Sequence, residues 1–352
     1  MRYRWTTTLL VCLSLILQEP RLDAADVSEH LEAIRAVLDQ HAERGLCGVV
    51  LIRAGNEELL HKAYGFADRE SKRRMTIDTG FDIGSLVKPI TATAVFRLEQ
   101  DGKLSTGDRL SKFFPDIPDD KRDITLNQVL RHTAGFADLF GGDYDIVTRD
   151  WFLDKALRAD LIGAPGKQER YSNSGYTLLA VIIENVSGQS YEAYVNEHVL
   201  RPADTPEIGY IIPQWRNDQL AVGYRRGRRW GTPLDHPWGD DGPSWNLRGN
   251  GGMLATAQQM CQWYEALFDG KIINPAQLDA YMDFDAGGSR ARRNRSLGHA
   301  GGNGVFNTQQ ESMIDRDVHL TFFTSTSQNR AEDVWPDIRK HFFAIARRYP
   351  NE

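Results

Sequence analysis

The chain has 352 residues, and its 42 Lys and Arg stand against 48 Asp and Glu, so its formal net charge is −6. Hydrophobic residues make up 41% and charged residues 26%, which excludes a collagen, a low-complexity chain and a disordered one. The mixed charge excludes a general basic footprint for nucleic acid. Three cysteines are too few for a disulfide scaffold and show no metal-ligand spacing. The length allows one large domain or two interlocked ones.

The first residues have the pattern of a secretory leader. Arg2 and Arg4 precede a short apolar run over 9–17, and a pair of small residues closes the segment at Ala24-Ala25. A membrane-spanning helix needs about 20 apolar residues, and this run is about half as long. We predict a signal peptide over 1–25, with an uncleaved anchor or a buried helix as the alternative.

The remaining chain is expected to be soluble and exported, either periplasmic or secreted, with no stable membrane span. Only Cys47 and Cys261 remain in it, and the sequence leaves open whether they pair.

The hydrophobic spacing predicts the following elements in chain order. They are a helix over 26–43, a β-hairpin of strands 47–53 and 58–65, helices over 85–100, 174–188, 190–200 and 257–268, a strand over 318–325 and a closing helix over 333–347. Residues 226–250 are expected to be irregular. If the terminal parts share one sheet, the helical middle is an insertion. We predict an α+β fold whose α/β part comprises 26–80 and 251–350, with a mainly helical lobe over 81–250.

Ser85 and Lys88 form the first candidate for chemistry. They lie three residues apart at a predicted helix start, so one turn brings both onto one face. A serine hydroxyl becomes nucleophilic when a neighbouring base takes its proton, and a lysine does so if its pKa is lowered. Backbone N–H groups at a helix start could hold an oxyanion. A solvated pair with no catalytic role would have the same spacing.

Tyr171 and Asn173 form the second candidate, in a loop just before a helix. A tyrosine near a lysine could relay a proton, and an asparagine amide could orient a substrate carbonyl. The same spacing occurs at 194–196 and 349–351, within a helix and at the tail, where a structural role is expected. Context, not spacing, therefore selects Tyr171.

His299 and the glycines after it form the third candidate. Gly301 and Gly302 permit close approach of the backbone to a ligand, and His299 could hydrogen-bond near the nucleophile. An ordinary turn with an exposed histidine is the alternative. No Gly-x-Ser-x-Gly elbow, His-Glu-x-x-His motif or phosphate-binding loop occurs, so we expect no metal and no cofactor.

In this order the three motifs resemble the serine β-lactamase and penicillin-binding-protein superfamily. The branch is the one that holds class C β-lactamases, D-alanyl-D-alanine carboxypeptidases, esterases and D-aminopeptidases. The resemblance covers roughly residues 30–330. It rests also on four longer segments: FDIGSLVKPITATAVFRLEQDGKL, ITLNQVLRHTAGF, YSNSGYTLLAVIIENVSGQSYEAYVNEHVLRP and GNGGMLATAQQMCQW. It implies an antiparallel sheet flanked by helices, with the active site between the sheet and the inserted helical lobe.

The resemblance also implies a role for each motif residue. Ser85 would be the acylated nucleophile and Lys88 its proton partner. Tyr171 would be a general acid and base, its pKa lowered by Lys88 and by the histidine of the third motif. Asn173 would hold a substrate amide or the Lys88 side chain. The backbone N–H groups of Ser85 and Gly302 would form the oxyanion hole.

The third motif departs from the β-lactamase pattern. His299, Ala300 and Gly301 would face Ser85 from the sheet edge and contact the substrate, but β-lactamases usually have Lys-Thr-Gly there. A permanent cation and a hydroxyl for a substrate carboxylate are therefore missing, which is more typical of peptidase and esterase relatives.

Two further groups have open interpretations. One is an arginine cluster, which is either a solvated loop or a clamp for an anionic substrate: Arg290, Arg292, Arg293 and Arg295. The other is a set of tryptophans that either line the mouth of the cleft or pack against a long loop: Trp230, Trp238 and Trp245.

We therefore predict an exported serine hydrolase that cleaves a small-molecule or peptide ester or amide through an acyl-enzyme on Ser85. The expected types are an esterase, a D-aminopeptidase or a D-Ala-D-Ala carboxypeptidase. A β-lactamase is the alternative within the superfamily. A non-catalytic relative that binds a peptide or a cell-wall fragment is the alternative of another class, and no nucleic-acid partner is expected.

Overall fold

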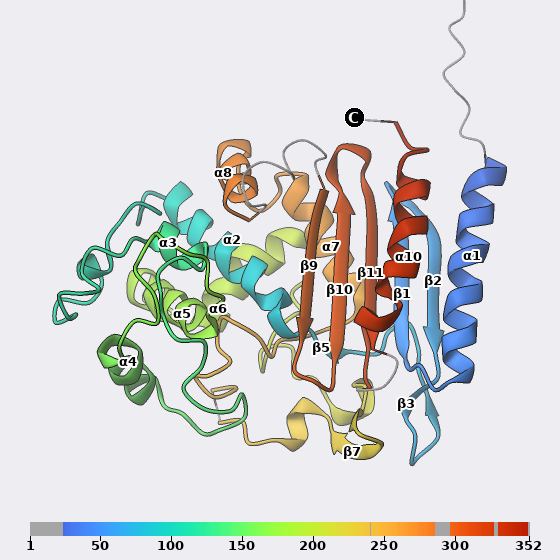
Figure 1. Cartoon of the computed structure of the whole chain (residues 1–352), viewed down its shortest axis with the longest axis horizontal. Helices are drawn as coiled ribbons and strands as arrows, with labels where there is room; N and C mark the ends of the chain where they lie inside the picture. Colours follow the sequence, from blue (N-terminus) through green and yellow to red (C-terminus); the bar gives the residue numbers. More distant parts are fainter. Residues whose placement is uncertain (1–23, 240, 286–295, 327–329, 351–352) are drawn as a thin grey trace, which may run out of the picture.

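A five-stranded antiparallel sheet forms one side of the molecule, which a computed structural model describes over residues 24–239, 241–285, 296–326 and 330–350 (Figure 1). Its strand order is β2-β1-β11-β10-β9. The strands are β1 (Gly48–Ala54), β2 (Glu57–Tyr64), β9 (Ser296–Gly302), β10 (Asn307–Met313) and β11 (Val318–Thr324). β1 pairs with β11 from Gly48 opposite Thr324 to Ala54 opposite Val318. The two ends of the chain therefore share one sheet, which was the condition for regarding the helical middle as an insertion.

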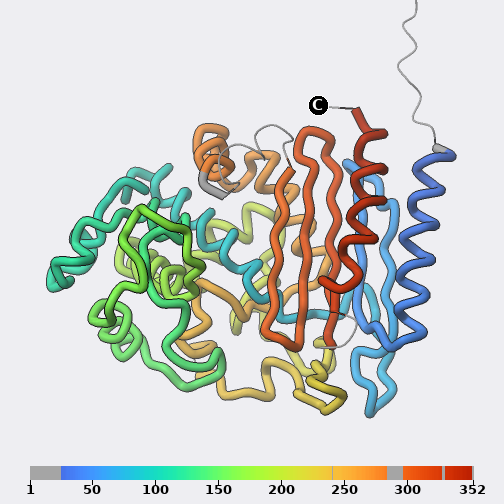
Figure 2. The backbone as a smooth tube through the Cα atoms, in the orientation of Figure 1, coloured from blue at the N-terminus to red at the C-terminus, as the bar shows by residue number. Residues whose placement is uncertain are grey.

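Helices cover both faces of this sheet. α1 (Ala24–Glu43) and α10 (Ala331–Ala346) pack on one face, and α7 (Ala257–Phe268) packs on the other. Both faces are covered because successive side chains of a strand point to opposite faces and those of β1 are apolar on each. Val50 and Ile52 belong to the core under α1 and α10, while Val49 belongs to the core on the opposite face. The first and last helices lie side by side in Figure 2.

The helical lobe is built around α2 (Val87–Gln100). This helix is buried on nearly all sides, because apolar residues and small threonines surround its axis. The other helices of this side of the molecule are α3 (Leu126–Leu130), α4 (Arg149–Arg158), α5 (Asn173–Ser187), α6 (Tyr191–Val195), which continues as a π-helical turn over Asn196–Leu200, and α8 (Pro275–Asp285). The predicted α+β class, with an antiparallel sheet and helices beside it, is confirmed.

Several segments form strands that the sequence pattern did not predict. β9 and β10 are rich in glycine and in polar residues, so neither shows the alternation of a half-buried strand. They are strands because β10 pairs along its whole length with β11 and β9 pairs along β10. Within the expected irregular stretch, β6 (Gly223–Arg225) and β7 (Arg228–Gly231) form a short hairpin. Arg226 and Gly227 both have positive φ in its turn, so the turn rather than any hydrophobic pattern makes the hairpin.

Three small two-stranded sheets complete the fold. β3 (Phe66–Asp68) pairs with β4 (Arg73–Arg74), β5 (Phe81–Asp82) pairs with β8 (Leu254–Ala255), and β6 pairs with β7. The β5–β8 pair is important for the site, because β5 leads directly into the turn that carries Ser85.

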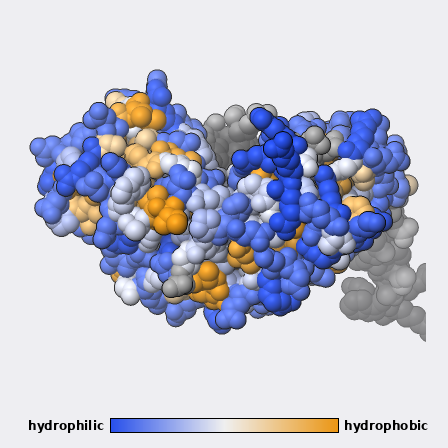
Figure 3. Space-filling model, turned by 90° about the horizontal axis from the view of Figure 1, so that it is seen from below, coloured by the Kyte–Doolittle hydropathy of each residue, from blue (hydrophilic) through white to orange (hydrophobic). Residues whose placement is uncertain are grey.

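The surface is mixed in character. On the face shown in Figure 3, the apolar areas are small and lie among hydrophilic residues. Among the helices that the structure describes, no segment is both long and apolar enough to cross a bilayer. The predicted leader lies outside the described residues, except for Ala24 and Ala25, which begin α1.

The two cysteines of the body of the chain do not pair. Cys47 and Cys261 are both free and buried. The Cys261 thiol lies 3.5 Å from a carboxylate oxygen of Glu265, and burial raises its pKa well above the ordinary value. The open question of their pairing is thus answered by the fold.

Candidate active site between the sheet edge and the helical lobe

Ser85 lies in a short 3₁₀ turn over Gly84–Leu86 that precedes α2. Gly84 has a φ of +51°, and a Cβ there would come within 2.3 Å of the backbone nitrogen of Gly302 on β9. Only glycine permits both this conformation and this approach. The turn is therefore pressed against the edge of the main sheet, and Ser85 is presented at the junction between sheet and helical lobe.

Lys88 is held by three oxygen atoms. Its Nζ lies 3.0 Å from Ser85 Oγ, 2.6 Å from Asn173 Oδ1 and 2.7 Å from the carbonyl oxygen of Asn250. Only 5% of the residue is exposed. Burial lowers the pKa of Lys88 to about 7, although the negative charges of Asp138 and Asp143 oppose this shift.

This coordination suits a neutral amine. A neutral lysine has two N–H donors and one lone pair. Asn173 and Asn250 offer acceptors for the two donors, so the lone pair is left to accept the proton of Ser85. Lys88 is thus arranged as a base for Ser85 at neutral pH.

Tyr171 lies on the other side of Ser85. The two hydroxyl oxygens are 2.7 Å apart, and Lys88 Nζ lies 4.8 Å from the centre of the Tyr171 ring. The expectation of a lowered pKa for Tyr171 is wrong. Loss of hydration raises the pKa of Tyr171 to about 12, and the negative charges of Asp138 and Asp143 also raise it. The hydrogen bond with Ser85 acts in the opposite direction and lowers it. Because Lys88 itself has a pKa of about 7, it supplies no full positive charge that could stabilise a phenolate.

Asn173 is the first residue of α5 and is fixed from both sides. Its Oδ1 accepts from Lys88, and its Nδ2 donates to Asp138 Oδ1 at 2.8 Å. Ser172 caps the helix by accepting the N–H of Gly175 at 3.0 Å, and the N–H of Ser172 donates to His132 Nδ1 at 3.1 Å. Of the two roles expected for Asn173, its contacts are those of a holder of Lys88.

The third motif lies on β9, the edge strand of the main sheet. A Cβ on Gly301 would come within 2.8 Å of the backbone nitrogen of Ser85, so the two backbones touch. His299 Nδ1 lies 2.8 Å from the Tyr264 hydroxyl, which comes from α7. His299 and Ala300 line one wall of the cavity next to Ser85.

Two spaces border Ser85. A cavity of about 340 Å³ is bounded by α2, the 130–133 segment, the 169–176 segment and β9. On the other side of Ser85 is a smaller recess, whose wall includes Gly84, Ser85, Asn250, Gly302 and Asn303. Ser85 and Gly302, the two residues expected to form an oxyanion hole, thus bound the same recess.

Several residues of the site had no role in the sequence analysis. Asn250 contributes a backbone carbonyl, Asp138 orients an amide, and Tyr264 contacts the histidine. The ring of His132 lies 4.6 Å from that of Tyr171. The segments around His132 and Asn250 were part of the family resemblance, and this was the one available signal. Because every residue has a backbone carbonyl oxygen, the residue type at a position does not indicate that its carbonyl has a role.

The three tryptophans are packed against other side chains. Trp245 is buried and lines another cavity together with Trp238. Trp230 packs on His236 at 3.8 Å and on Tyr144 at 5.2 Å between ring centres. None of the three bounds either space around Ser85 within the described residues. Of the two interpretations left open for the tryptophans, these contacts favour packing against a long loop, since Trp230 packs on Tyr144, His236 and Phe306. The arginine cluster at 290–295 lies outside the described residues.

A family model described as "Beta-lactamase" matches residues 32–329. The chain belongs to the β-lactamase family. This finding agrees with the order Ser85, Lys88, Tyr171, Asn173 and His299, which the fold brings into one site.

Among curated proteins, the chain is 33% identical over 231 residues to a putative penicillin-binding protein PbpX of Bacillus subtilis, covering 65% of this chain and 57% of that protein. It is 30% identical to penicillin-binding protein 4* of the same organism, covering 56% of this chain and 45% of the relative. It is 33% identical over 229 residues to esterase EstB of Burkholderia gladioli, covering 59% of this chain and 57% of that esterase. The chain thus spans about half the length of these relatives.

Among solved structures, a D-amino acid amidase from Ochrobactrum anthropi SV3 has a TM-score of 0.74 with 21% identity, covering 91% of this chain and 99% of that one. A penicillin-binding protein from Bacillus halodurans has a TM-score of 0.70 with 22% identity, covering 89% and 99%. At this level of identity the similarity shows that the fold is shared.

Proposed function

We propose that this protein is a serine hydrolase that cleaves a small ester or amide through an acyl-enzyme on Ser85. The observation that carries the proposal is the buried Lys88 Nζ, 3.0 Å from Ser85 Oγ and with a pKa near 7. A lysine in this state can take a proton from a serine at neutral pH, which an exposed lysine cannot do.

The reaction follows from this geometry. Lys88 accepts the proton of Ser85, and Oγ forms a bond to the substrate carbonyl carbon. The carbonyl oxygen becomes an oxyanion, which the backbone N–H groups of Ser85 and Gly302 would stabilise. When the leaving group departs, it must receive the proton that Lys88 has taken. The neutral Tyr171 hydroxyl, 2.7 Å from Ser85 Oγ, is positioned to hand that proton on. Water then hydrolyses the acyl-enzyme with the same groups.

The charges around Ser85 favour some substrates over others. Asp143 lines the recess shared by Ser85 and Gly302, Asp138 contacts Asn173, and Glu169 lines the larger cavity. On β9 the residue facing the cavity is His299 rather than a permanent cation. The three carboxylates outnumber Arg131, the arginine that lines the larger cavity, so a substrate carboxylate is disfavoured and a substrate ammonium is favoured. This supports an esterase or D-aminopeptidase type over a β-lactamase and over a carboxypeptidase, whose substrates both carry a carboxylate, and similarity to an esterase and to a D-amino acid amidase supports it further.

The direct test is covalent labelling with a fluorescent fluorophosphonate, followed by mass mapping of the label. We expect one label on Ser85 and none in Ser85→Ala, with Ser312→Ala, a buried serine outside the site, as the control. A label that persists in Ser85→Ala would refute the proposal. Absence of any acylation across a panel of esters and amides would support the alternative of a non-catalytic binding protein.

The substrate type needs a second experiment. Rates are compared for p-nitrophenyl esters, for D-phenylalanine p-nitroanilide with a free or an acetylated amine, and for the β-lactam nitrocefin. We expect the free amine to react faster than its acetylated form, and nitrocefin to be slow. Rapid nitrocefin turnover would instead identify a β-lactamase.

We also propose export and cleavage after the leader, which leaves 26–350 as one catalytic domain. The support is the pattern of the first 25 residues. N-terminal sequencing of protein recovered from a periplasmic extract should begin near residue 26. A chain that retains Met1 would show that the segment is not a cleaved leader.

A further inference from the structure

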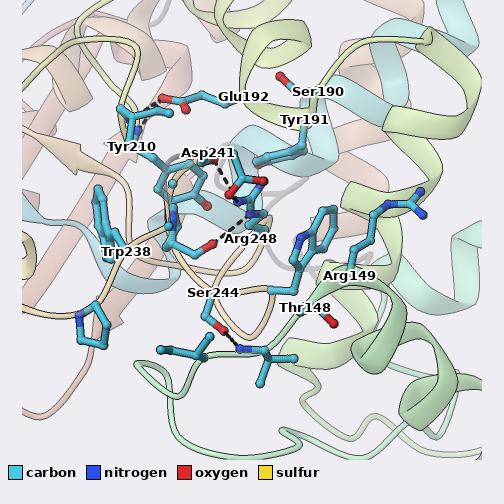
Figure 4. Close-up of a pocket in the computed structure, with 18 of the residues that line it drawn as sticks. Thr148, Arg149, Ser190, Tyr191, Glu192, Tyr210, Trp238, Asp241, Ser244 and Arg248 are labelled. Carbon is cyan, nitrogen blue, oxygen red and sulfur yellow. Dashed lines mark hydrogen bonds and ion pairs between the residues drawn. The ribbon is translucent and has the colours of Figure 1, made fainter.

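A second cavity lies among residues of the helical lobe and of the 237–248 segment (Figure 4). Its volume is about 570 Å³, within the range of small-molecule sites. Its walls come from the 146–149 segment, from α6, from residues 210–212 and from the 237–248 segment. Among the described residues it has no wall residue in common with either space around Ser85. It is therefore a site separate from the catalytic one.

The charged side chains of this cavity are already compensated within its walls. Arg248 donates to the side chain of Asp241 at 2.8 Å, and Arg149 donates to Glu184 at 3.0 Å. Glu192 Oε1 accepts the backbone N–H groups of residues 210, 211 and 212. Figure 4 shows Arg248 and Asp241 joined in the middle of the wall. A charged ligand would have to compete with these pairs, so the cavity favours an uncharged one.

The remaining wall is apolar and partly aromatic. Trp238 and Trp245 lie in it, Ile146 is 81% exposed and Ile212 is 42% exposed. The indole N–H of Trp238 is buried and has no hydrogen-bond partner among the described residues. A buried donor without an acceptor is costly, and the carbonyl oxygen of a ligand could supply one if the indole turns toward the cavity.

The same walls hold the turn that positions Lys88. The Tyr210 hydroxyl donates to the carbonyl oxygen of Gly251 at 2.9 Å and accepts the N–H of Gly249 at 3.2 Å. The Tyr191 hydroxyl lies 2.6 Å from Thr91 Oγ1, which donates to the carbonyl oxygen of Gly249 at 2.6 Å. Asn250, between these two glycines, is the residue whose carbonyl accepts from Lys88.

We propose that this second cavity binds a small uncharged aromatic molecule carrying a hydrogen-bond acceptor, and that its occupancy acts on Lys88 through the 249–251 turn. The first part is independent of catalysis. The effect on Lys88 rests on the proposed function, because it is measured as a change in the activity of the enzyme.

The binding test uses 4-fluoroacetophenone, an uncharged aromatic ketone, in a ¹⁹F NMR titration of the full chain. Affinity on the order of 1 mM is expected for so small a ligand. Ile212→Asp should weaken binding at least tenfold, and Trp238→Ala should weaken it as well. Ile162→Asp is the matched control, since Ile162 is 48% exposed and lies outside both cavities. Binding should be unchanged in Ile162→Asp and in Ser85→Ala.

Two results would overturn the binding proposal. One is the absence of saturable binding to a protein whose folding is verified by its melting curve. The other is binding that survives Ile212→Asp at full strength, because the ketone would then occupy another place. These outcomes do not depend on whether a substrate is found.

The coupling is tested on active enzyme with a saturating concentration of the same ketone. We expect the midpoint of the acid limb of the pH–activity profile to move, because the carbonyl of Asn250 moves relative to Lys88. An unchanged midpoint, with binding intact, would overturn the coupling and leave the binding site in place.

Discussion

Lys88 Nζ and the backbone carbonyl oxygen of Asn250 lie 2.7 Å apart, in a region with almost no access for water. This contact orients the amine, and burial keeps its pKa near 7. The Asn250 side chain fixes the turn by donating to Thr177 Oγ1 at 2.8 Å and to the carbonyl oxygen of Asn246 at 2.6 Å. Asn250 is thus a positioning residue for the proposed base.

Asn250→Ala should therefore shift the properties of Lys88. Loss of both side-chain hydrogen bonds loosens the turn, so we expect kcat to fall by about 10-fold and the acid-limb midpoint of the pH–activity profile to move. A merely structural role would lower the melting temperature and leave that midpoint unchanged. Asn217→Ala serves as control, because Asn217 lies in a turn that lines neither of the two spaces beside Ser85.

Lys88→Arg should lower the rate of Ser85 acylation by a factor of about 10²–10⁴. Arginine keeps a positive charge but cannot act as a base near neutral pH. The measurement is the single-turnover rate of Ser85 acylation, and Lys112→Arg on the surface is the control with unchanged rate. A rate within threefold of the unchanged protein would mean that Lys88 provides charge only and that another group takes the proton.

Removing nearby carboxylate charge should move the acid limb to lower pH. Asp138 and Asp143 raise the pKa of Lys88 toward its ordinary value, so Asp143→Asn should lower it. The neutral amine is the active form, so activity near pH 6 should rise relative to activity near pH 8. Asp123→Asn, whose side chain is 79% exposed, is the control. A midpoint that rises, or that stays fixed in the Asp143→Asn and Asp138→Asn variants alike, would contradict the assignment of the limb to Lys88.

Tyr171→Phe should lower the acylation rate by about 10²-fold, because the ring over Lys88 remains while the proton relay is lost. The raised pKa of Tyr171, about 12, adds a second expectation. The unchanged enzyme should show no loss of activity from phenol ionisation below about pH 10. A fall in activity near pH 9 that disappears in Tyr171→Phe would show that the Tyr171 phenol ionises at a lower pH than expected.

The contact between the first and last helices should make stability sensitive to acid. The Nδ1 atoms of His30 and His341 lie 3.1 Å apart, and His30 also contacts Asp26. Burial lowers the pKa of His341, and nearby positive charge lowers it further. The unfolded chain therefore binds more protons below about pH 6.5, and stability falls as the pH drops through that range. The charged groups facing this pair are Asp26, Glu29, Asp337, Lys340 and Arg348.

His341→Gln should reduce this sensitivity. Between pH 7.5 and 5.5 the melting temperature should fall by about 1–2 °C less than in the unchanged protein. His198→Gln, in the helical lobe, should leave the fall as it was. Equal falls in all three proteins would show that the helix contact does not titrate in this range.

The sequence by itself determined the local features of this protein. The three-residue step from Ser85 to Lys88 puts both side chains on one face, because that step is nearly one helical turn. The apolar runs of β1, α2, α5 and β11 predicted buried elements, because long apolar stretches are removed from water in a folded chain. The family was also recognisable, since its motifs keep their residue types and their order.

Only the tertiary structure decided the rest. β9 and β10 are polar or glycine-rich, and they are strands because β11 offers hydrogen bonds to β10 and β10 to β9. The carbonyl of Asn250 reaches Lys88 from 162 positions along the chain, and a carbonyl has no residue-type signature. The direction of the Tyr171 pKa was predicted wrongly, because it depends on partial loss of water around Tyr171, which stays 48% exposed, and on the burial of Lys88. Desolvation is a property of the packed whole, and no local pattern encodes it.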